Sequence, residues 1–156
     1  MKILIAYGTY SGSTKEVGEV IRKSLTKFGH EVSLTDMRDL KHDDFAPYEA
    51  FILGTNTWFE KNEEGMMNSA FISFKDSQPD KTLFGQRPVA VYALGDADQY
   101  LHFCKAADHL EEMVKEFDGK LVTPALRISR YLHDPEGKEN EINAWILQVA
   151  KGFTAP

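Results

Sequence analysis

The chain has 156 residues, of which 42% are hydrophobic and 27% are charged, and its formal net charge at pH 7 is −6. This composition excludes a disordered chain and is typical of a globular domain with a buried core. The net negative charge argues against nucleic acid and anionic membrane surfaces as partners. We therefore expect residues 1–156 to form a single soluble domain.

The acidic residues are concentrated in two segments. Residues 36–64 contain eight acidic and three basic residues, and residues 96–118 contain seven and two. Such segments predict a negative face that attracts a basic partner. Cys104 is the single cysteine, so no internal disulfide can form, and the apolar stretches are shorter than a membrane span or a signal-peptide core. These features predict a cytoplasmic protein.

Strand and helix patterns alternate along the chain. Apolar runs typical of strands occur at residues 2–7, 32–35, 50–55, 88–94 and 120–126. Four of these five runs are almost continuously apolar, which is typical of strands buried on both faces of a parallel sheet. Apolar side chains at helical spacing occur over residues 17–28, 110–117 and 142–149. Ser13 followed by Glu16 predicts a capping box at the start of the first helix, and Gly29 predicts its end.

This alternation predicts an α/β fold. We expect an open five-stranded parallel sheet with strand order 2-1-3-4-5 and helices on both faces. In such sheets a ligand binds beyond the carboxyl ends of the strands, between strands 1 and 3. The functional residues are therefore expected in the loops after the first, third and fourth strands.

The first of these loops reads TYSGST and runs into a helix. Free N–H groups and the positive end of the helix dipole make such a position an anion site. The hydroxyl groups of Thr9, Ser11, Ser13 and Thr14 add donors, and Gly12 lets the backbone approach a ligand closely. Ser, Thr and Gly are also ordinary helix caps, so this stretch alone leaves phosphate binding and plain capping both open.

Aromatic residues occur in both of the other loops, among polar neighbours that offer nothing local to bury them. Trp58 and Phe59 follow the third strand, and Tyr100 follows the fourth. Two aromatic side chains on facing loops beside an anion site predict a flat ring sandwiched between them. Stacking of this kind contributes roughly 0.5–1.5 kcal/mol beyond the burial of area.

On these motifs the chain resembles the flavodoxins, and the resemblance covers nearly its whole length. The motifs are TYSGST after the first strand, GTNTW after the third, and GD…Y..FC.A.D after the fourth. The family's phosphate loop usually has threonine and asparagine where this chain has Ser11 and Ser13, which still form hydrogen bonds. The absence of a long insertion in the last strand resembles the short-chain group. The resemblance implies flavin mononucleotide (FMN), bound tightly but not covalently.

The resemblance also implies a role for each loop. The first loop would hold the phosphate, Trp58 and Tyr100 would stack on the two faces of the ring, and the segment 94–96 would meet its pyrimidine edge. The loop after the fourth strand carries one residue more than in many short-chain relatives, so the exact flavin contacts of Asp98, Gln99 and Tyr100 stay open. The implied cofactor-binding residues are Thr9, Tyr10, Ser11, Gly12, Ser13, Thr14, Asn56, Thr57, Trp58, Phe59, Leu94, Gly95, Asp96, Tyr100 and Phe103.

The implied function is that of a monomeric one-electron carrier, not an enzyme, docking on a reductase and on acceptor redox enzymes through an acidic face around the flavin edge. Lys61 is the sole cation in the three loops, so the surroundings oppose negative charge on the reduced flavin and predict a low potential. Phe59 stands where many relatives have a glycine whose peptide flips toward flavin N5. A bulky residue disfavours positive φ, so we expect weaker stabilisation of the neutral semiquinone.

Two other functions are compatible with the sequence. The alternative is an FMN-dependent NAD(P)H:quinone oxidoreductase of the same fold, which needs a nicotinamide pocket and usually longer loops or an oligomer. A partner-binding module without flavin is a third. The Gly-x-Gly-x-x-Gly and Gly-Lys-Ser/Thr motifs of other nucleotide-binding proteins are missing from the sequence. We expect Cys104 to pack in the core, and His102 and His109 lack the third ligand of a metal site.

Overall fold

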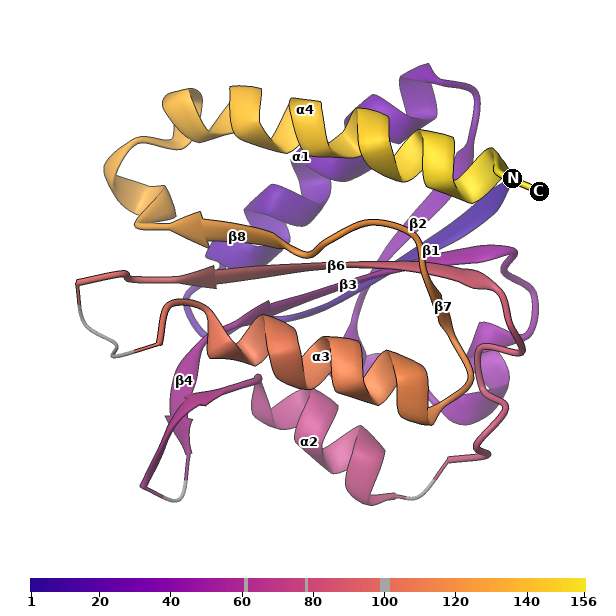
Figure 1. Cartoon of the computed structure of the whole chain (residues 1–156), viewed down its shortest axis with the longest axis horizontal. Coiled ribbons are helices and arrows are strands. Elements are labelled where there is room, and N and C mark those ends of the chain that lie inside the picture. The colour runs from indigo at the N-terminus through magenta and orange to yellow at the C-terminus, as the bar shows by residue number, and fades with distance from the viewer. Residues whose placement is uncertain (61, 78, 99–101) are drawn as a thin grey trace.

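The computed structural model describes residues 1–60, 62–77, 79–98 and 102–156, and of Phe59 and Glu60 only the backbone. The central element is a parallel sheet with two strands paired in succession along its outer edge (Figure 1). Its strands, in spatial order, are β2 (Glu31–Asp36), β1 (Lys2–Gly8), β3 (Ala50–Asn56), β6 (Pro88–Gly95), and then β7 (Lys120–Leu121) and β8 (Leu126–Ser129). The predicted order 2-1-3-4-5 is confirmed, with β7 and β8 together in the fifth place.

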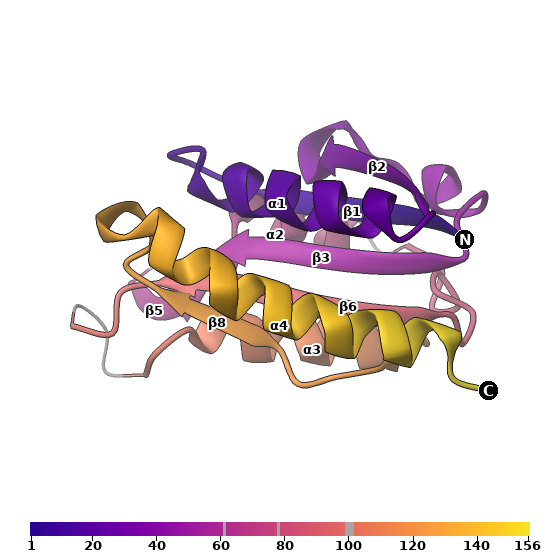
Figure 2. The ribbon, with the colours of Figure 1, turned by 90° about the horizontal axis from the view of Figure 1, so that it is seen from above.

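Helices cover both faces of the sheet, as predicted (Figures 1 and 2). One face carries α1 (Ser13–Lys27) and α4 (Pro135–Thr154), and the other carries α2 (Ser69–Asp76) and α3 (Lys105–Glu116). Successive side chains of a strand point to opposite faces, so β1 contributes Ile3 and Ile5 to one core and Leu4 to the other. This burial on both faces explains the continuous apolar runs. Among the described helices, none is long and apolar enough to span a membrane.

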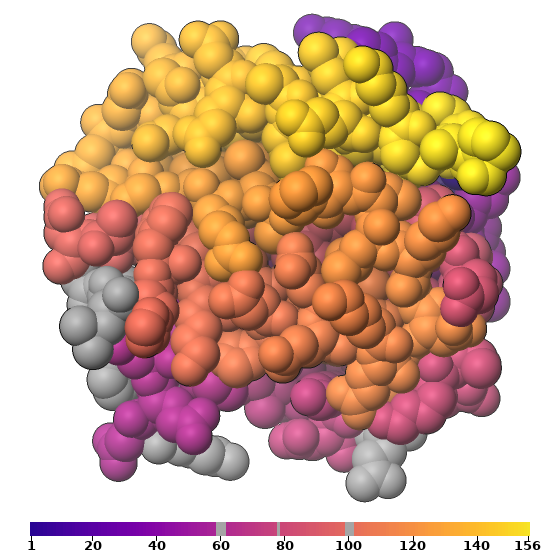
Figure 3. Space-filling model, viewed as in Figure 1, coloured from indigo at the N-terminus to yellow at the C-terminus, as the bar shows by residue number. Residues whose placement is uncertain are grey.

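The fifth strand is broken, whereas the sequence predicted one strand over residues 120–126. Pro124 lies in the break, where it cannot donate a ladder hydrogen bond. Side chains from two helices bind the backbone there: Trp145 Nε1 donates to the Pro124 carbonyl oxygen at 3.0 Å, and the Ala125 N–H donates to Glu111 Oε1 at 3.2 Å. This edge of the sheet lies at the surface between α4 and α3 (Figure 3).

The segment after β3 has more regular structure than predicted. A loop was expected after the third strand, but the chain there forms two antiparallel strands, β4 (Trp58–Glu60) and β5 (Glu63–Met66). Strands of three and four residues are too short to show a periodic pattern. The helix α2 that follows was not predicted either, and Asn68 caps it by accepting the Ala70 N–H at 2.9 Å. Short 3₁₀ helices occur at Met37–Asp39, His42–Phe45 and Tyr131–His133.

Arg87 joins the chain segments at the amino ends of the strands. Its guanidinium donates to the carbonyl oxygens of Leu83 at 2.6 Å, Tyr48 at 2.7 Å and Phe45 at 3.0 Å, and its Nε donates to that of Phe84 at 2.7 Å. A planar cation with several fixed donors suits this arrangement better than a single ammonium group does. Arg87 therefore acts as a structural crosslink at the end of the sheet that carries the termini (Figure 1).

We expect Arg87→Lys to lower the free energy of unfolding by about 2 kcal/mol, because lysine leaves several of these carbonyl oxygens without a donor. Denaturant unfolding followed by circular dichroism measures this change. The matched control is Arg22→Lys, which alters a partly exposed pair with Glu19 on α1 and should cost less than about 0.5 kcal/mol. Equal losses in the two variants would contradict the crosslink.

Candidate functional site

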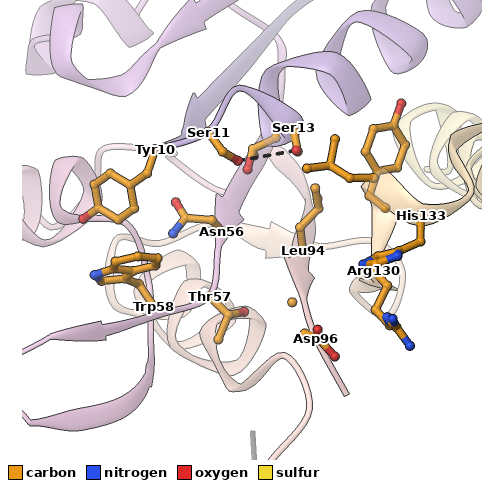
Figure 4. A pocket seen from close by; sticks show the side chains of 14 residues that line it. Tyr10, Ser11, Ser13, Asn56, Thr57, Trp58, Leu94, Asp96, Arg130 and His133 are labelled. Carbon is orange, nitrogen blue, oxygen red and sulfur yellow. Dashed lines mark hydrogen bonds between the residues drawn. The ribbon is translucent and has the colours of Figure 1, made fainter. Parts of the chain in front are cut away.

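A pocket of about 300 Å³ lies at the carboxyl ends of β1, β3, β6 and β8, at the end of the sheet away from the termini (Figures 1 and 4). The parallel arrangement of the strands brings these loops together, although they are far apart in the sequence. The pocket is lined by Tyr10, Ser11, Ser13, Thr14, Asn56, Thr57, Trp58, Leu94, Gly95, Asp96, Arg130, Tyr131, Leu132 and His133.

The loop after β1 leads into α1 without a side-chain cap. Gly12 is the N-cap with a φ of 95°, and Ser13 is the first helical residue. The predicted capping box of Ser13 and Glu16 is therefore wrong, because Ser13 lies one position inside the helix; its hydroxyl is 3.4 Å from that of Ser11. Thr9 shapes the loop by accepting the Gly12 N–H at 2.9 Å and is not among the lining residues. The uncapped first turn leaves its N–H groups for an anion.

The first turn of α1 is joined to the core through Thr14. Its hydroxyl oxygen is buried and has no hydrogen-bond partner among the described residues. Its carbonyl oxygen accepts a hydrogen bond from Tyr92 Oη at 2.8 Å, and the Tyr92 ring is fully buried. Two glycines make room for that ring: a Cβ at Gly54 would lie 2.0 Å from it, and a Cβ at Gly18 3.0 Å from its hydroxyl. The tyrosine thus fixes the height of the first turn above the sheet.

One end of the pocket is aromatic. Tyr10 and Trp58 each expose 49% of their surface, and their rings meet edge to face with centroids 5.2 Å apart (Figure 4). Tyr10 Oη accepts the N–H of Ser69 at 3.0 Å, which fixes this tyrosine to the start of α2. Trp58 is therefore a surface residue with ring area available for stacking. Tyr100, predicted to face it, lies outside the described residues, and so does the side chain of Phe59.

Two hydrogen bonds hold the chain at the end of β3, one to β6 and one to the residue that caps α2. The Thr57 N–H donates to the Leu94 carbonyl oxygen at 2.8 Å. Asn56 Oδ1 accepts a hydrogen bond from Asn68 Nδ2 at 2.8 Å, which orients the amide of Asn56. The first bond sets the spacing between the walls after β3 and β6, and the second fixes the side chain of Asn56.

The loop that follows β6 is turned by its first acidic residue. Asp96 Oδ1 accepts the N–H of Asp98 at 2.9 Å, the short-range bond of an Asx turn. Leu94, Gly95 and Asp96 line the pocket, whereas Phe103 is 36% exposed and is not among the lining residues. Gln99 is outside the described part of the chain.

Cys104 lies under this loop and packs in the core, as predicted. It is fully buried against Ala93 and Ala107, and a Cβ at Gly95 would lie 3.0 Å from its sulfur. Burial raises the pKa of the Cys104 thiol to about 11. Within the described residues there is no group of three or more His, Cys, Asp and Glu side chains placed to hold a metal ion.

The wall after β8 was missed by the sequence analysis. This wall is formed by Arg130, Tyr131, Leu132 and His133. Arg130 and His133 lie on the side of the pocket opposite Trp58 (Figure 4). Arg130 has a φ of 51°, and its Nη1 lies 3.0 Å from Asp98 Oδ2. The sequence motifs did not indicate a contact between this segment and the other loops. The site therefore contains a cation that the three predicted loops did not supply.

Comparison with known proteins identifies the family. Residues 5–145 match the family model described as Flavodoxin. The chain is 34% identical over 143 residues to probable flavodoxin 2 of Bacillus subtilis (strain 168), with 90% of this chain and 87% of that protein covered. It is similar to the structure of oxidised flavodoxin 2 from Bacillus cereus, with a TM-score of 0.83, 31% identity and coverage of 98% and 100%. A Fusobacterium nucleatum flavodoxin bound to flavin mononucleotide shares the fold, with a TM-score of 0.80, 19% identity and coverage of 98% and 99%.

The chain belongs to the flavodoxin family, whose members are electron-transfer flavoproteins.

We expect the Cys104 thiol to react slowly in the folded protein. Because burial raises its pKa to about 11 and the thiolate is the reacting form, alkylation by iodoacetamide at pH 9 should be at least about tenfold slower than in guanidinium chloride. Mass spectrometry of timed samples measures both rates, and the folded rate should rise with pH up to about 11. Equal rates in folded and unfolded protein would show that the thiol is accessible.

Proposed function

We propose that this protein is a one-electron carrier that binds FMN in the pocket and transfers electrons between a reductase and acceptor redox enzymes. The observation that carries the proposal is the start of α1, where an uncapped helical turn coincides with a buried threonine hydroxyl that has no partner in the described part of the chain, beside an aromatic wall. Such a turn is a ready anion site, and a buried hydroxyl without a partner costs free energy until a ligand pairs with it.

The phosphate end of FMN fits this turn. The N–H groups of the first turn, the Thr14 hydroxyl and the hydroxyls of Ser11 and Ser13 would hold the phosphate through dipoles and neutral donors. Gly12 has no side chain, and nothing lies within 4 Å of a Cβ built there. The loop therefore leaves open space over the turn. The phosphate would keep its negative charge, because this loop contains no cation.

The ring end fits the aromatic wall. Trp58 would stack on the isoalloxazine, replacing part of its solvent contact, while Asn56 and Thr57 flank the ring and residues 94–96 meet its pyrimidine edge. When bound, FMN supplies the one-electron chemistry, and the chain binds it, orients it and limits its contact with water. Acidic segments around the loops support docking of reductase and acceptor enzymes on this end of a monomer.

The low potential is part of the proposal. The retained phosphate charge and the acidic residues oppose further negative charge on the flavin, although Arg130 now acts in the opposite direction. Membership of a family of electron-transfer proteins favours the carrier over the quinone oxidoreductase that the sequence left open. The lone buried cysteine is compatible with a reducing compartment, so the proposed location is the cytoplasm.

FMN titration and electron delivery test the function. The apoprotein should bind one FMN per chain with loss of flavin fluorescence, and the complex should carry electrons from NADPH and an added flavodoxin reductase to cytochrome c. Without the reductase, NADPH oxidation should stay at background. No FMN binding would exclude the proposal, and direct NADPH oxidation with a quinone at comparable rates would establish the oxidoreductase instead.

Thr14→Val tests the phosphate site separately. Valine has the same shape without the buried hydroxyl, so we expect the apoprotein to gain about 1 kcal/mol in free energy of unfolding while FMN affinity falls about tenfold. Riboflavin, which lacks the phosphate, is the control ligand, and its affinity should not change. Urea unfolding of the apoprotein and fluorescence titration measure the two effects. A parallel loss of FMN and riboflavin affinity would place the phosphate elsewhere.

A further inference from the structure

The pocket contains a cation from outside the three loops predicted to form it. Arg130, which follows β8, lines the pocket together with Asp96 and His133 (Figure 4). The predicted loops offered Lys61 as their sole cation. Arg130 therefore adds a positive charge at the border of the pocket.

Backbone hydrogen bonds hold Arg130 beside the end of β6. Its N–H donates to the Gly95 carbonyl oxygen at 2.9 Å, and the preceding Ser129 Oγ accepts the Ala97 N–H at 3.2 Å. Its φ of 51° lies in the left-handed region, which is uncommon for a residue with a Cβ. Arg130 is thus fixed next to residues 94–96, the segment expected to meet the pyrimidine edge of the flavin.

A carboxylate partly offsets this cation. The distance from Arg130 Nη1 to Asp98 Oδ2 is 3.0 Å, and the two side chains are 46% and 74% exposed. An ion pair so open to solvent contributes little to the stability of a fold. Its two charges act mainly through the electric field that they produce in the pocket.

Reduction places negative charge on the flavin, and in the fully reduced form this charge is concentrated at the pyrimidine edge. A cation there stabilises the reduced form more than the oxidised form, and a carboxylate does the opposite. We propose that Arg130 raises the affinity of the pocket for the reduced, anionic cofactor, and that its ion pair with Asp98 limits this effect. The inference rests on the proposed function, because it requires FMN in this pocket.

Neutral variants with a matched control test the inference. Arg130→Gln and Asp98→Asn each remove one charge and keep a polar side chain. Arg22→Gln removes the same charge as the first from a partly exposed ion pair with Glu19 on α1, outside the pocket. Fluorescence titration gives the Kd of oxidised FMN for each protein, anaerobic redox titration gives the midpoint potentials, and together they give the ratio of reduced to oxidised Kd.

We expect Arg130→Gln to raise that ratio at least threefold and Asp98→Asn to lower it. Because the two forms differ by two electrons, a threefold change shifts the sum of the two one-electron potentials by about 28 mV, a tenfold change corresponding to about 59 mV. Arg22→Gln should change the ratio less than half as much. Equal shifts in Arg130→Gln and Arg22→Gln, or shifts of the same sign in Arg130→Gln and Asp98→Asn, would overturn the inference.

A further measurement separates the ring from the phosphate. If Arg130→Gln weakens oxidised and reduced FMN equally and leaves riboflavin binding unchanged, the arginine serves the phosphate and the inference is wrong. A wild-type chain that binds no FMN overturns the proposed function and the inference with it. Each of the other contrary outcomes overturns the inference alone.

Discussion

A single buried hydrogen bond, from Tyr92 to the carbonyl oxygen of Thr14, sets where α1 begins relative to the sheet. The bond is possible because Gly18 and Gly54 leave the space that the tyrosine ring fills. With the helix held at this height, its uncapped turn and the Thr14 hydroxyl border the pocket, and the hydroxyl pairs with none of the residues that the structure describes. The missing cap and the unpaired hydroxyl lower stability, and they are the features on which the proposed phosphate site depends.

The fold was largely predictable from the sequence, and the errors of the prediction were confined to single elements. Strands buried on both faces produce apolar runs that are easy to recognise, and Gly29, with a φ of 89°, does follow the end of α1. The hairpin after β3 was missed because its strands are too short for periodicity. The capping box failed because the left-handed Gly12 takes the N-cap position, which sequence spacing alone does not reveal.

The candidate site was predictable where its residues follow strands directly. Residues 11, 13 and 14, 56–58 and 94–96 all line the pocket, as a sheet with this strand order requires. Arg130 also follows a strand directly, but the sequence predicted the fifth strand over residues 120–126, whereas β8 ends at Ser129, so the loop that carries Arg130 was not identified. Counting the charged residues of the three predicted loops therefore underestimated the positive charge that borders the pocket. The resemblance to a family supplied the identity of the proposed ligand. The geometry of the pocket alone favours only a ligand with an anionic group and a flat ring.

The broken edge strand also has a consequence for how the molecule behaves in a crowded solution. An uninterrupted edge strand offers a row of free N–H and C=O groups to which another chain can add. Here β7 has two residues and β8 four, and the Pro124 carbonyl oxygen and the Ala125 N–H between them are bonded to Trp145 and Glu111. The helices thus occupy backbone groups at which a second sheet could otherwise join, and this margin of the protein is protected against intermolecular aggregation.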